Sequence, residues 1–269
     1  MNVVVAIPVY RIPESNELIS LRRCCKILRK YDIVLVCPVG FDMLEYKNVF
    51  YEYDVNFAVE YFDEKYFESI DGYNRLLLSE IFYLRFKKYE YLLIYQLDAY
   101  VFSDDLEYWC GKGYDYVGAP LLGGGDEKVY NDDMLTRVGN GGFSLRRIQT
   151  YIDYFNGEKH VFNASQIVKH ISLWKKPYTR IFVWILMMFG WRNTPEVVAA
   201  RYKRNEDVFW SLYLNGSNYS LKKPTPNEAM YFAFERFPSS LYRITKKLPF
   251  GCHAWAKYEY LEFWKDYIK

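Results

Sequence analysis

The sequence predicts an α/β protein built on a mostly parallel, Rossmann-like central sheet with flanking helices. Residues 3–7 and 33–37 are short runs of apolar, largely β-branched residues, each stopped by a proline, as in strands buried on both faces. Between them, residues 15–30 repeat apolar side chains at helical spacing, with Ser15 as the expected N-cap. A strand, a helix and a strand at this spacing form a βαβ unit, which starts a parallel sheet.

Further elements continue this pattern along the chain. Residues 73–86 predict a helix and residues 91–95 the next strand, and we expect two later strands at residues 115–118 and 142–145. A polar, glycine-rich stretch at 123–137 separates these two strands and is long enough to form a mobile loop. The chain of 269 residues shows no internal repeat and no clean linker, which favours one compact unit.

Composition and charge narrow the class of protein. A chain that is 51% hydrophobic and 25% charged is a folded globular protein, so wholesale disorder is excluded. Residues 1–150 contain 17 basic and 23 acidic residues, whereas residues 151–269 contain 18 and 10, so the second half carries a net charge of +8. This half favours an anionic partner such as a sugar nucleotide, a lipid phosphate or a membrane surface. The charge is too diffuse for duplex nucleic acid, and no nucleic-acid-binding motif accompanies it.

The cysteines and the N-terminal sequence favour a cytoplasmic protein. The five cysteines contain no CxxC pair, which is typical of reduced, mostly buried thiols. The first ten residues lack a basic leader, so we expect no secretory signal. The longest apolar stretch, residues 181–191, is about half of the ~20 residues that a membrane-spanning helix needs.

The segment 174–191 mixes apolar and basic residues and has two interpretations. As a core helix, it would pack its apolar residues inward. As an interfacial helix, it would place Lys175, Lys176 and Arg180 against anionic head groups while Trp184 and Phe189, among other apolar residues, enter the bilayer.

The first candidate for chemistry follows the strand at residues 91–95. Asp98 lies at the carboxyl end of this strand, and open α/β sheets bind ligands in the crevice beyond such ends. A carboxylate there can hold Mg²⁺ or Mn²⁺ against a diphosphate, although a strand-terminal Asp can equally cap a turn.

Two further motifs come later in the chain. Residues 138–147 place glycines around Asn140 just before a strand, which allows the backbone to approach a ligand closely or simply makes a tight turn. Glu206 and Asp207 lie at the start of an expected helix. There they either interact favourably with the helix dipole or include the general base for an incoming hydroxyl. Neither a P-loop nor a GxGxxG motif is present, which argues against ATP or a nicotinamide cofactor.

A fourth candidate is His253, in a loop punctuated by proline and glycine and flanked by aromatic residues. With only three histidines in the chain, it is a candidate ligand, although a structural histidine is the commoner outcome.

The order of these four motifs resembles that of GT-A nucleotide-sugar glycosyltransferases, which carry an acidic metal motif, a glycine loop, an xED motif and a C-terminal histidine. More closely, the chain resembles a bacterial family long catalogued as a domain of unknown function, whose members sit among cell-surface polysaccharide genes. The matching strings extend from residue 7 to 255, and the segment 156–203 matches least clearly. They are IPVY, SIDGYNRLLLS, YLLIYQLDAYVF, YDYVGAP, VGNGGFSLR, NEDVFW, EAMYFAFE and PFGCHAW.

The resemblance implies a single GT-A-like domain over residues 1–269. Its nucleotide-binding half would be residues 1–120, and its acceptor half residues 121–269 with an inserted apolar and basic helical segment at about 156–203. It also implies a sugar donor linked to a nucleotide, UDP by the same resemblance, and an acceptor that is a glycan or a glycan on a polyprenyl diphosphate. A protein of this kind would work in the cytoplasm at the inner face of the membrane.

Residue roles follow from the same resemblance. Asp98 and His253 would hold a divalent cation, Asp207 would be the base of an inverting reaction, and Glu206 would orient substrate. The other implied contacts are Pro8, Val9 and Tyr10 on the base, Arg75 on the uracil or diphosphate, and Asn140, Gly141 and Gly142 near the donor or acceptor sugar. Among the aromatic residues we expect Trp255, which lies beside His253 in the sequence, near the acceptor or donor sugar.

One position departs from the family pattern. Gln96 replaces the first acid of the DxD motif, so the resemblance implies an Mn²⁺ or Mg²⁺ site with only one carboxylate in this motif. A retaining reaction stays open, because the xED acid is not the base in every GT-A family. Two other functions also stay open: a non-catalytic glycan- or lipid-binding module, which Gln96 favours, and a sugar nucleotidyltransferase. The absence of glycine between Val9 and Ser15 counts against the nucleotidyltransferase.

Overall fold

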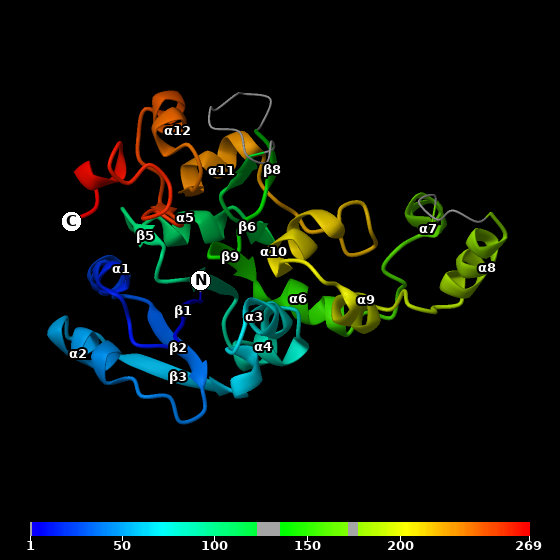
Figure 1. The fold of residues 1–269 in the computed structure, drawn as a ribbon, viewed down its shortest axis with the longest axis horizontal. Coiled ribbons are helices and arrows are strands. Elements are labelled where there is room, and N and C mark those ends of the chain that lie inside the picture. Colours follow the sequence, from blue (N-terminus) through cyan, green and yellow to red (C-terminus); the bar gives the residue numbers. More distant parts are fainter. Residues whose placement is uncertain (1, 123–134, 172–176) are drawn as a thin grey trace.

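The computed structural model describes residues 2–122, 135–171 and 177–269, and a six-stranded sheet lies at its centre (Figure 1). The strand order is β3-β2-β1-β4-β9-β6. Strands β3, β2, β1 and β4 pair in parallel, and β9 alone is reversed, because it pairs antiparallel with both β4 and β6. The prediction of a mostly parallel sheet is confirmed. The strands are β1 (Val3–Pro8), β2 (Asp32–Pro38), β3 (Phe57–Phe62), β4 (Tyr91–Tyr95), β6 (Tyr116–Val117) and β9 (Phe143–Arg147).

Both faces of the sheet are covered, as the apolar strand sequences require. In β1 the side chains of Val3, Val5 and Ile7 belong to one apolar cluster, and those of Val4 and Ala6 belong to a second. Residues alternate between the faces of a strand, so an unbroken apolar run indicates a sheet with helices on each side. All five cysteines are buried and free, as expected.

The first helix begins one position earlier than its predicted N-cap implies. In α1 (Ser15–Ile27) the N-cap is Glu14, and Ser15 is the first helical residue. The Glu14 side chain and that of Glu17 form a capping box, in which Glu17 accepts from the Glu14 backbone N–H at 2.8 Å. The predicted N-cap was therefore wrong, because a glutamate pair satisfies the first turn instead of a serine.

The single helix predicted at 73–86 is two helices, so that prediction was also wrong. They are α3 (Ile70–Leu77), whose N-cap Ser69 accepts from the Gly72 N–H at 3.1 Å, and α4 (Glu80–Arg85). Between them Ser79 has extended backbone, and its hydroxyl donates to the Leu76 carbonyl at 2.6 Å. A serine that bonds locally to the backbone ends the first helix and begins the second.

Two small sheets lie beside the central one. One has the order β10-β11-β5 and the other pairs β7 with β8. Most of the loop expected at 123–137 lies outside the described residues; its last part belongs to β8. The strands are β5 (Tyr100–Val101), β7 (Pro120–Leu122), β8 (Leu135–Val138), β10 (Ala233–Phe234) and β11 (Gly251–Cys252).

The remaining helices flank the sheets. They are α2 (Leu44–Glu52), α5 (Leu106–Gly111), α6 (Ile148–Phe155), α7 (Ala164–Ile171), α8 (Pro177–Met188), α9 (Pro195–Arg201), α10 (Glu206–Val208), α11 (Pro226–Phe232) and α12 (Pro238–Thr245), with short turns η1 (Glu64–Tyr66), the π-helical η3 (Phe209–Tyr213) and η4 (Trp264–Asp266). No helix in the described ranges has the length and apolarity that crossing a membrane requires.

Helices α7 and α8 form an excursion from the main body, at the opposite end of the molecule from α1 and α2 (Figure 1). Its base is closed by Asn193, which is fully buried. The Asn193 side chain accepts from the Phe162 N–H at 2.9 Å and donates to the Phe162 carbonyl at 3.0 Å, while its own carbonyl accepts from Val161. The excursion therefore leaves and re-enters the body at one point.

Candidate active site

A cavity of about 730 Å³ lies beyond the carboxyl ends of β1 and β4, and ten of the thirteen predicted site residues line it. Ligands of open α/β sheets bind in this position, and the volume lies within the range of small-molecule sites. The ten are Pro8, Tyr10, Gln96, Asp98, Asn140, Gly141, Gly142, Glu206, Asp207 and His253.

The small sheet brings three ionisable residues to one wall of this cavity. Phe234 of β10 pairs with Cys252 of β11, and Cys252 also pairs with Tyr100 of β5. Glu235 and His253 directly follow their strands, and Asp98 precedes β5 by two residues, so this register gathers all three at one end of the sheet. His253 Nε2 lies 3.1 Å from Asp98 Oδ1, and its Nδ1 lies 3.3 Å from Glu235 Oε1.

In the absence of a metal ion, this arrangement favours the protonated form of His253. Burial opposes its charged form, but the contacts with Asp98 and Glu235 outweigh burial and raise the pKa of His253 to about 10. Burial raises the pKa of Asp98 in turn, yet the contact with His253 dominates and leaves that pKa below its ordinary value. Without a bound metal ion, one wall of the cavity therefore carries an imidazolium between two carboxylates; binding of a metal ion by His253 would require loss of the Nε2 proton.

Asn140, Gly141 and Gly142, here called the glycine turn, line the cavity between His253 and Asp207. Asn140 has the left-handed φ of 70° and is buried, and its amide lies 3.0 Å from His253 Nδ1. A Cβ on Gly142 would collide with the imidazole of His253 and the amide of Gln96. A Cβ on Gly141 would collide with the Glu206 carboxylate and press on Asp207. Both glycines are required by close approach of side chains.

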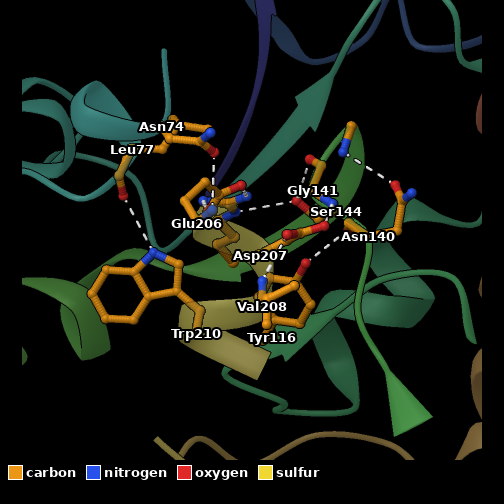
Figure 2. A network of polar contacts seen from close by, with 12 residues as sticks. Asn74, Leu77, Tyr116, Asn140, Gly141, Ser144, Glu206, Asp207, Val208 and Trp210 are labelled. Atoms are coloured by element: carbon orange, nitrogen blue, oxygen red, sulfur yellow. Dashed lines mark hydrogen bonds and ion pairs between the residues drawn. The ribbon is translucent and has the colours of Figure 1, made fainter. Parts of the chain in front are cut away.

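Asp207 contacts the glycine turn at Gly141, whereas His253 lies against Gly142 (Figure 2 shows the contact of Asp207). Asp207 Oδ2 accepts from the Gly141 N–H at 3.1 Å and its Oδ1 from the Val208 N–H at 2.7 Å. Burial raises the pKa of Asp207, and these hydrogen bonds partly oppose the shift. A carboxylate with raised pKa, lining a cavity, has the properties of a general base.

Glu206 is buried and forms an ion pair with Arg146. Arg146 was not among the site residues predicted from the sequence. Arg146 Nη2 lies 2.7 Å from Glu206 Oε1 and Nη1 lies 3.0 Å from Oε2, and Arg146 is fully buried. Burial raises the pKa of Glu206, and the pair with Arg146 opposes that shift. Arg146 Nε also donates to the Ser144 hydroxyl, which donates to the Gly141 carbonyl at 2.9 Å. The network fixes the glycine turn and the Glu206–Asp207 segment relative to each other. The sequence did contain a signal for Arg146: it is a charged residue directly after the strand expected at 142–145, on the same face as Ser144.

Residues Tyr73 and Asn74 line the cavity, whereas Arg75 does not. The Asn74 amide oxygen accepts from the Glu206 N–H at 2.9 Å (Figure 2). Arg75 instead donates to carbonyls at the end of α9, those of Ala200 at 2.7 Å and Tyr202 at 2.6 Å. Arg75 therefore does not face the cavity in which the resemblance implied a contact with the nucleotide. Successive residues of a helix point in different directions, so Tyr73 and Asn74 can line the cavity while Arg75 points elsewhere.

Two other implied contacts also lie outside the cavity lining. Val9 is 1% exposed, and its N–H donates to the Val36 carbonyl at 2.9 Å, so it extends the core. Trp255 is 1% exposed and packs in the apolar cluster around Tyr100. Burial in the core overrides the local sequence signal at both positions.

Glu235 is a cavity residue that the sequence analysis missed. Glu235 is the last residue of the string EAMYFAFE. The feature of the sequence that could have identified it is an acidic residue directly after a short apolar run.

The Asp98 wall fits a divalent cation in its chemistry. Gln96 Oε1 lies 3.4 Å from His253 Nε2, close to the 3.1 Å from Asp98 Oδ1. Adjacent ligands of an octahedral ion at about 2.1 Å are roughly 3.0 Å apart, so the Asp98 carboxylate and a neutral His253 imidazole are suitably spaced, and the Gln96 amide oxygen lies slightly farther from the imidazole. Across the described ranges there is no cluster of three or more Asp, Glu, His or Cys side chains arranged for a metal. Substrate phosphates and water would supply the other ligands, as is common for Mg²⁺.

The comparisons with known proteins assign the family. A family model described as "Protein of unknown function (DUF5672)" matches residues 56–253, and the chain belongs to this family. No curated protein matches the chain.

Among solved structures, the galactosyltransferase LgtC in complex with donor and acceptor sugar analogs covers 93% of this chain and 86% of its own, at 10% identity and a TM-score of 0.48. Core-mannan synthase A from Aspergillus fumigatus, in its Mn/GDP form, covers 78% and 71%, at 12% identity and a TM-score of 0.42. TarS of S. aureus covers 57% of this chain, at 14% identity and a TM-score of 0.35.

The chain spans only 30% to 49% of the length of the TarS chains that it matches. Glycosyltransferases are thus among the proteins to which the chain is similar. Because these TM-scores are below 0.5, the function proposed below rests on the geometry of the cleft.

Proposed function

We propose that the protein is a glycosyltransferase that moves a sugar from a nucleotide donor to a glycan, or to a glycan carried on a polyprenyl diphosphate, in surface polysaccharide synthesis. One observation carries the proposal: a single cleft at the carboxyl ends of β1 and β4 has a carboxylate of raised pKa at one end and a cationic or cation-binding wall at the other. UDP is proposed as the nucleotide on the resemblance of the motifs.

The two ends suit the two changes of charge in glycosyl transfer. The acceptor oxygen attacks the anomeric carbon, the bond from that carbon to the phosphate oxygen breaks, and its electron pair leaves with the nucleoside diphosphate. Asp207 takes the proton of the acceptor hydroxyl, while Gly141 and Val208 hold its carboxylate by their N–H groups. Attack on the face opposite the leaving group inverts the configuration.

The wall with Asp98 and His253 would receive the diphosphate. Asp98, Gln96 and a neutral His253 would hold a divalent cation, which would supply positive charge where the leaving group gains negative charge. Glu235 contacts Nδ1 of the imidazole and so keeps His253 oriented with Nε2 toward the cavity.

Pro8, Tyr10 and Phe67 also line the cleft. The Tyr10 ring is half-exposed and its centroid lies 6.3 Å from that of Phe67. In this proposal the rings of Tyr10 and Phe67 contact the nucleotide base, whereas Val9, between Pro8 and Tyr10 in the sequence, belongs to the core.

The test is turnover of a UDP-sugar by Asp207→Asn, which keeps the shape of the side chain. General-base help is worth about 10²–10⁴ in rate, so turnover should fall by that factor while UDP affinity stays unchanged. Asp153→Asn, on the exposed face of α6, is the matched control. Near-normal turnover by Asp207→Asn, or a product of retained configuration, would exclude Asp207 as the base.

A second candidate is a non-catalytic nucleotide- or glycan-binding module, which the replacement of a DxD acid by Gln96 favours. Such a module would bind a UDP-sugar without hydrolysing or transferring it. Release of UDP from a UDP-sugar, lost in Asp207→Asn, separates the two candidates.

A further inference from the structure

Helix α8 presents an apolar stripe to solvent. Its most exposed apolar side chains are separated by three or four residues, the spacing of one helical face. They are Tyr178 (66% exposed), Ile181 (64%), Phe182 (60%) and Ile185 (41%), followed by Phe189 (86%) just beyond the helix.

The opposite face of α8 is also apolar, but it is packed. Val183 is 8% exposed, and Trp184 and Met187 pack against the apolar cluster that contains Ile167 of α7. A helix that is apolar on two faces needs partners on both, and among the described residues partners pack against only one of them. The core-helix interpretation therefore explains the packed face of α8 but not the exposed apolar side chains on its other face.

The charge of the excursion indicates what covers the second face. Residues 159–195 contain six Lys and Arg and no Asp or Glu. Of these cations, Lys175 and Lys176 lie outside the described residues. Arg180 lies on α8, and Arg192 stacks on the Trp191 ring, 4.2 Å from its centroid. Apolar and aromatic side chains with basic neighbours are typical of a helix in the interface of an anionic bilayer.

A second copy of the chain fits this surface less well. In a two-fold symmetric dimer the same patch meets itself, so Arg180 and Arg192 would face like charges. Residues 159–195 offer no carboxylate to neutralise them.

We propose that the exposed stripe of α8 docks on an anionic membrane, with the apolar side chains at the level of the head groups and upper acyl chains. Figure 1 shows the excursion at one end of the molecule, away from α1 and α2. Helix α9 continues from it toward Glu206 and Asp207, and Arg75 fixes the end of α9.

The experiment is co-sedimentation of the full chain with vesicles, in the absence of any nucleotide. The protein should sediment with vesicles of equal phosphatidylglycerol and phosphatidylcholine and stay in solution with phosphatidylcholine alone. Phe182→Ser combined with Phe189→Ser should lower the binding constant by roughly tenfold or more. Arg180→Gln combined with Arg192→Gln should lower it by up to roughly thirtyfold.

The matched control is Leu44→Ser combined with Tyr51→Ser, two exposed apolar residues of α2 at the other end of the molecule. It should bind vesicles as the unaltered chain does. Circular dichroism confirms that each variant is folded. Equal binding by the Phe182/Phe189 variant and the control would overturn the proposal. So would a dimer, measured by sedimentation velocity, that only the Phe182/Phe189 variant dissociates. Neither outcome bears on turnover, so the proposed function is tested separately.

Discussion

The backbone N–H of Gly141 donates to Asp207 Oδ2 at 3.1 Å, and this contact joins the glycine turn to the proposed base. Gly142, the next residue, faces His253 and Gln96 instead. Two adjacent glycines thus contact opposite ends of one cleft.

This relationship predicts different consequences for two similar substitutions. Gly141→Ala would push the Glu206 carboxylate and press on Asp207, so we expect turnover to fall at least about tenfold with UDP affinity retained. Gly142→Ala would displace His253 and Gln96, so UDP affinity should fall. Calorimetry with UDP and a transfer assay on both variants check this. Equal losses of affinity in the two variants would show that the glycines do not separate the two ends.

The buried pair of Arg146 and Glu206 predicts a large effect on stability. Glu206→Gln leaves the enclosed guanidinium without its counter-charge, and breaking such a pair costs about 3–5 kcal/mol. Urea denaturation measures the free energy of unfolding. Replacing both residues by Met should recover most of the loss, because no uncompensated charge then stays buried. A loss below about 1 kcal/mol in Glu206→Gln would contradict a tightly held pair.

The pKa of His253 predicts how stability depends on pH. The folded protein raises this pKa from 6.5 to about 10, so between these values the folded state binds a proton that the unfolded state has released. The stabilisation is therefore fully present below pH 6.5 and is lost as pH rises toward 10.

Thermal unfolding in EDTA, measured from pH 6.5 to 10, tests this prediction. His253→Gln should lose the part of the slope that comes from this proton, and His160→Gln, outside the cavity lining, should keep it. Parallel pH curves for the unaltered protein and His253→Gln would refute the assignment.

Arg75 predicts the reverse pattern from a ligand-binding arginine. Because it donates to the carbonyls at the end of α9, Arg75→Gln should lower the free energy of unfolding by about 1–3 kcal/mol. UDP affinity should not change, and calorimetry checks this. A folded variant of full stability that binds UDP weakly would restore the contact implied by the resemblance.

Much of the fold was predictable because burial on both faces marks a parallel strand. The apolar runs at β1, β2 and β4 identified the βαβ start and the edge at which Asp98 lies. The reversal of β9 was not predictable, since strand direction depends on the path of the chain between strands and leaves no pattern within a strand of five residues.

The lining of the cavity was predictable where a motif lies close to the end of a strand, as for Asp98 and His253. It was not predictable where side-chain direction decides the role, as for Arg75, or where core packing decides it, as for Trp255 and Val9. Glu235 and Arg146 were missed because their importance comes from partners far away in the sequence: His253 for one, Glu206 for the other.

The most direct test of the central claim is calorimetric titration of UDP into the protein, first with Mn²⁺ and then with EDTA. The account predicts binding with Mn²⁺ that is strongly weakened by EDTA and by Asp98→Asn. Binding that ignores both would contradict the cation role of Asp98 and His253. No binding of UDP or of another nucleoside diphosphate in either buffer would contradict the donor site itself.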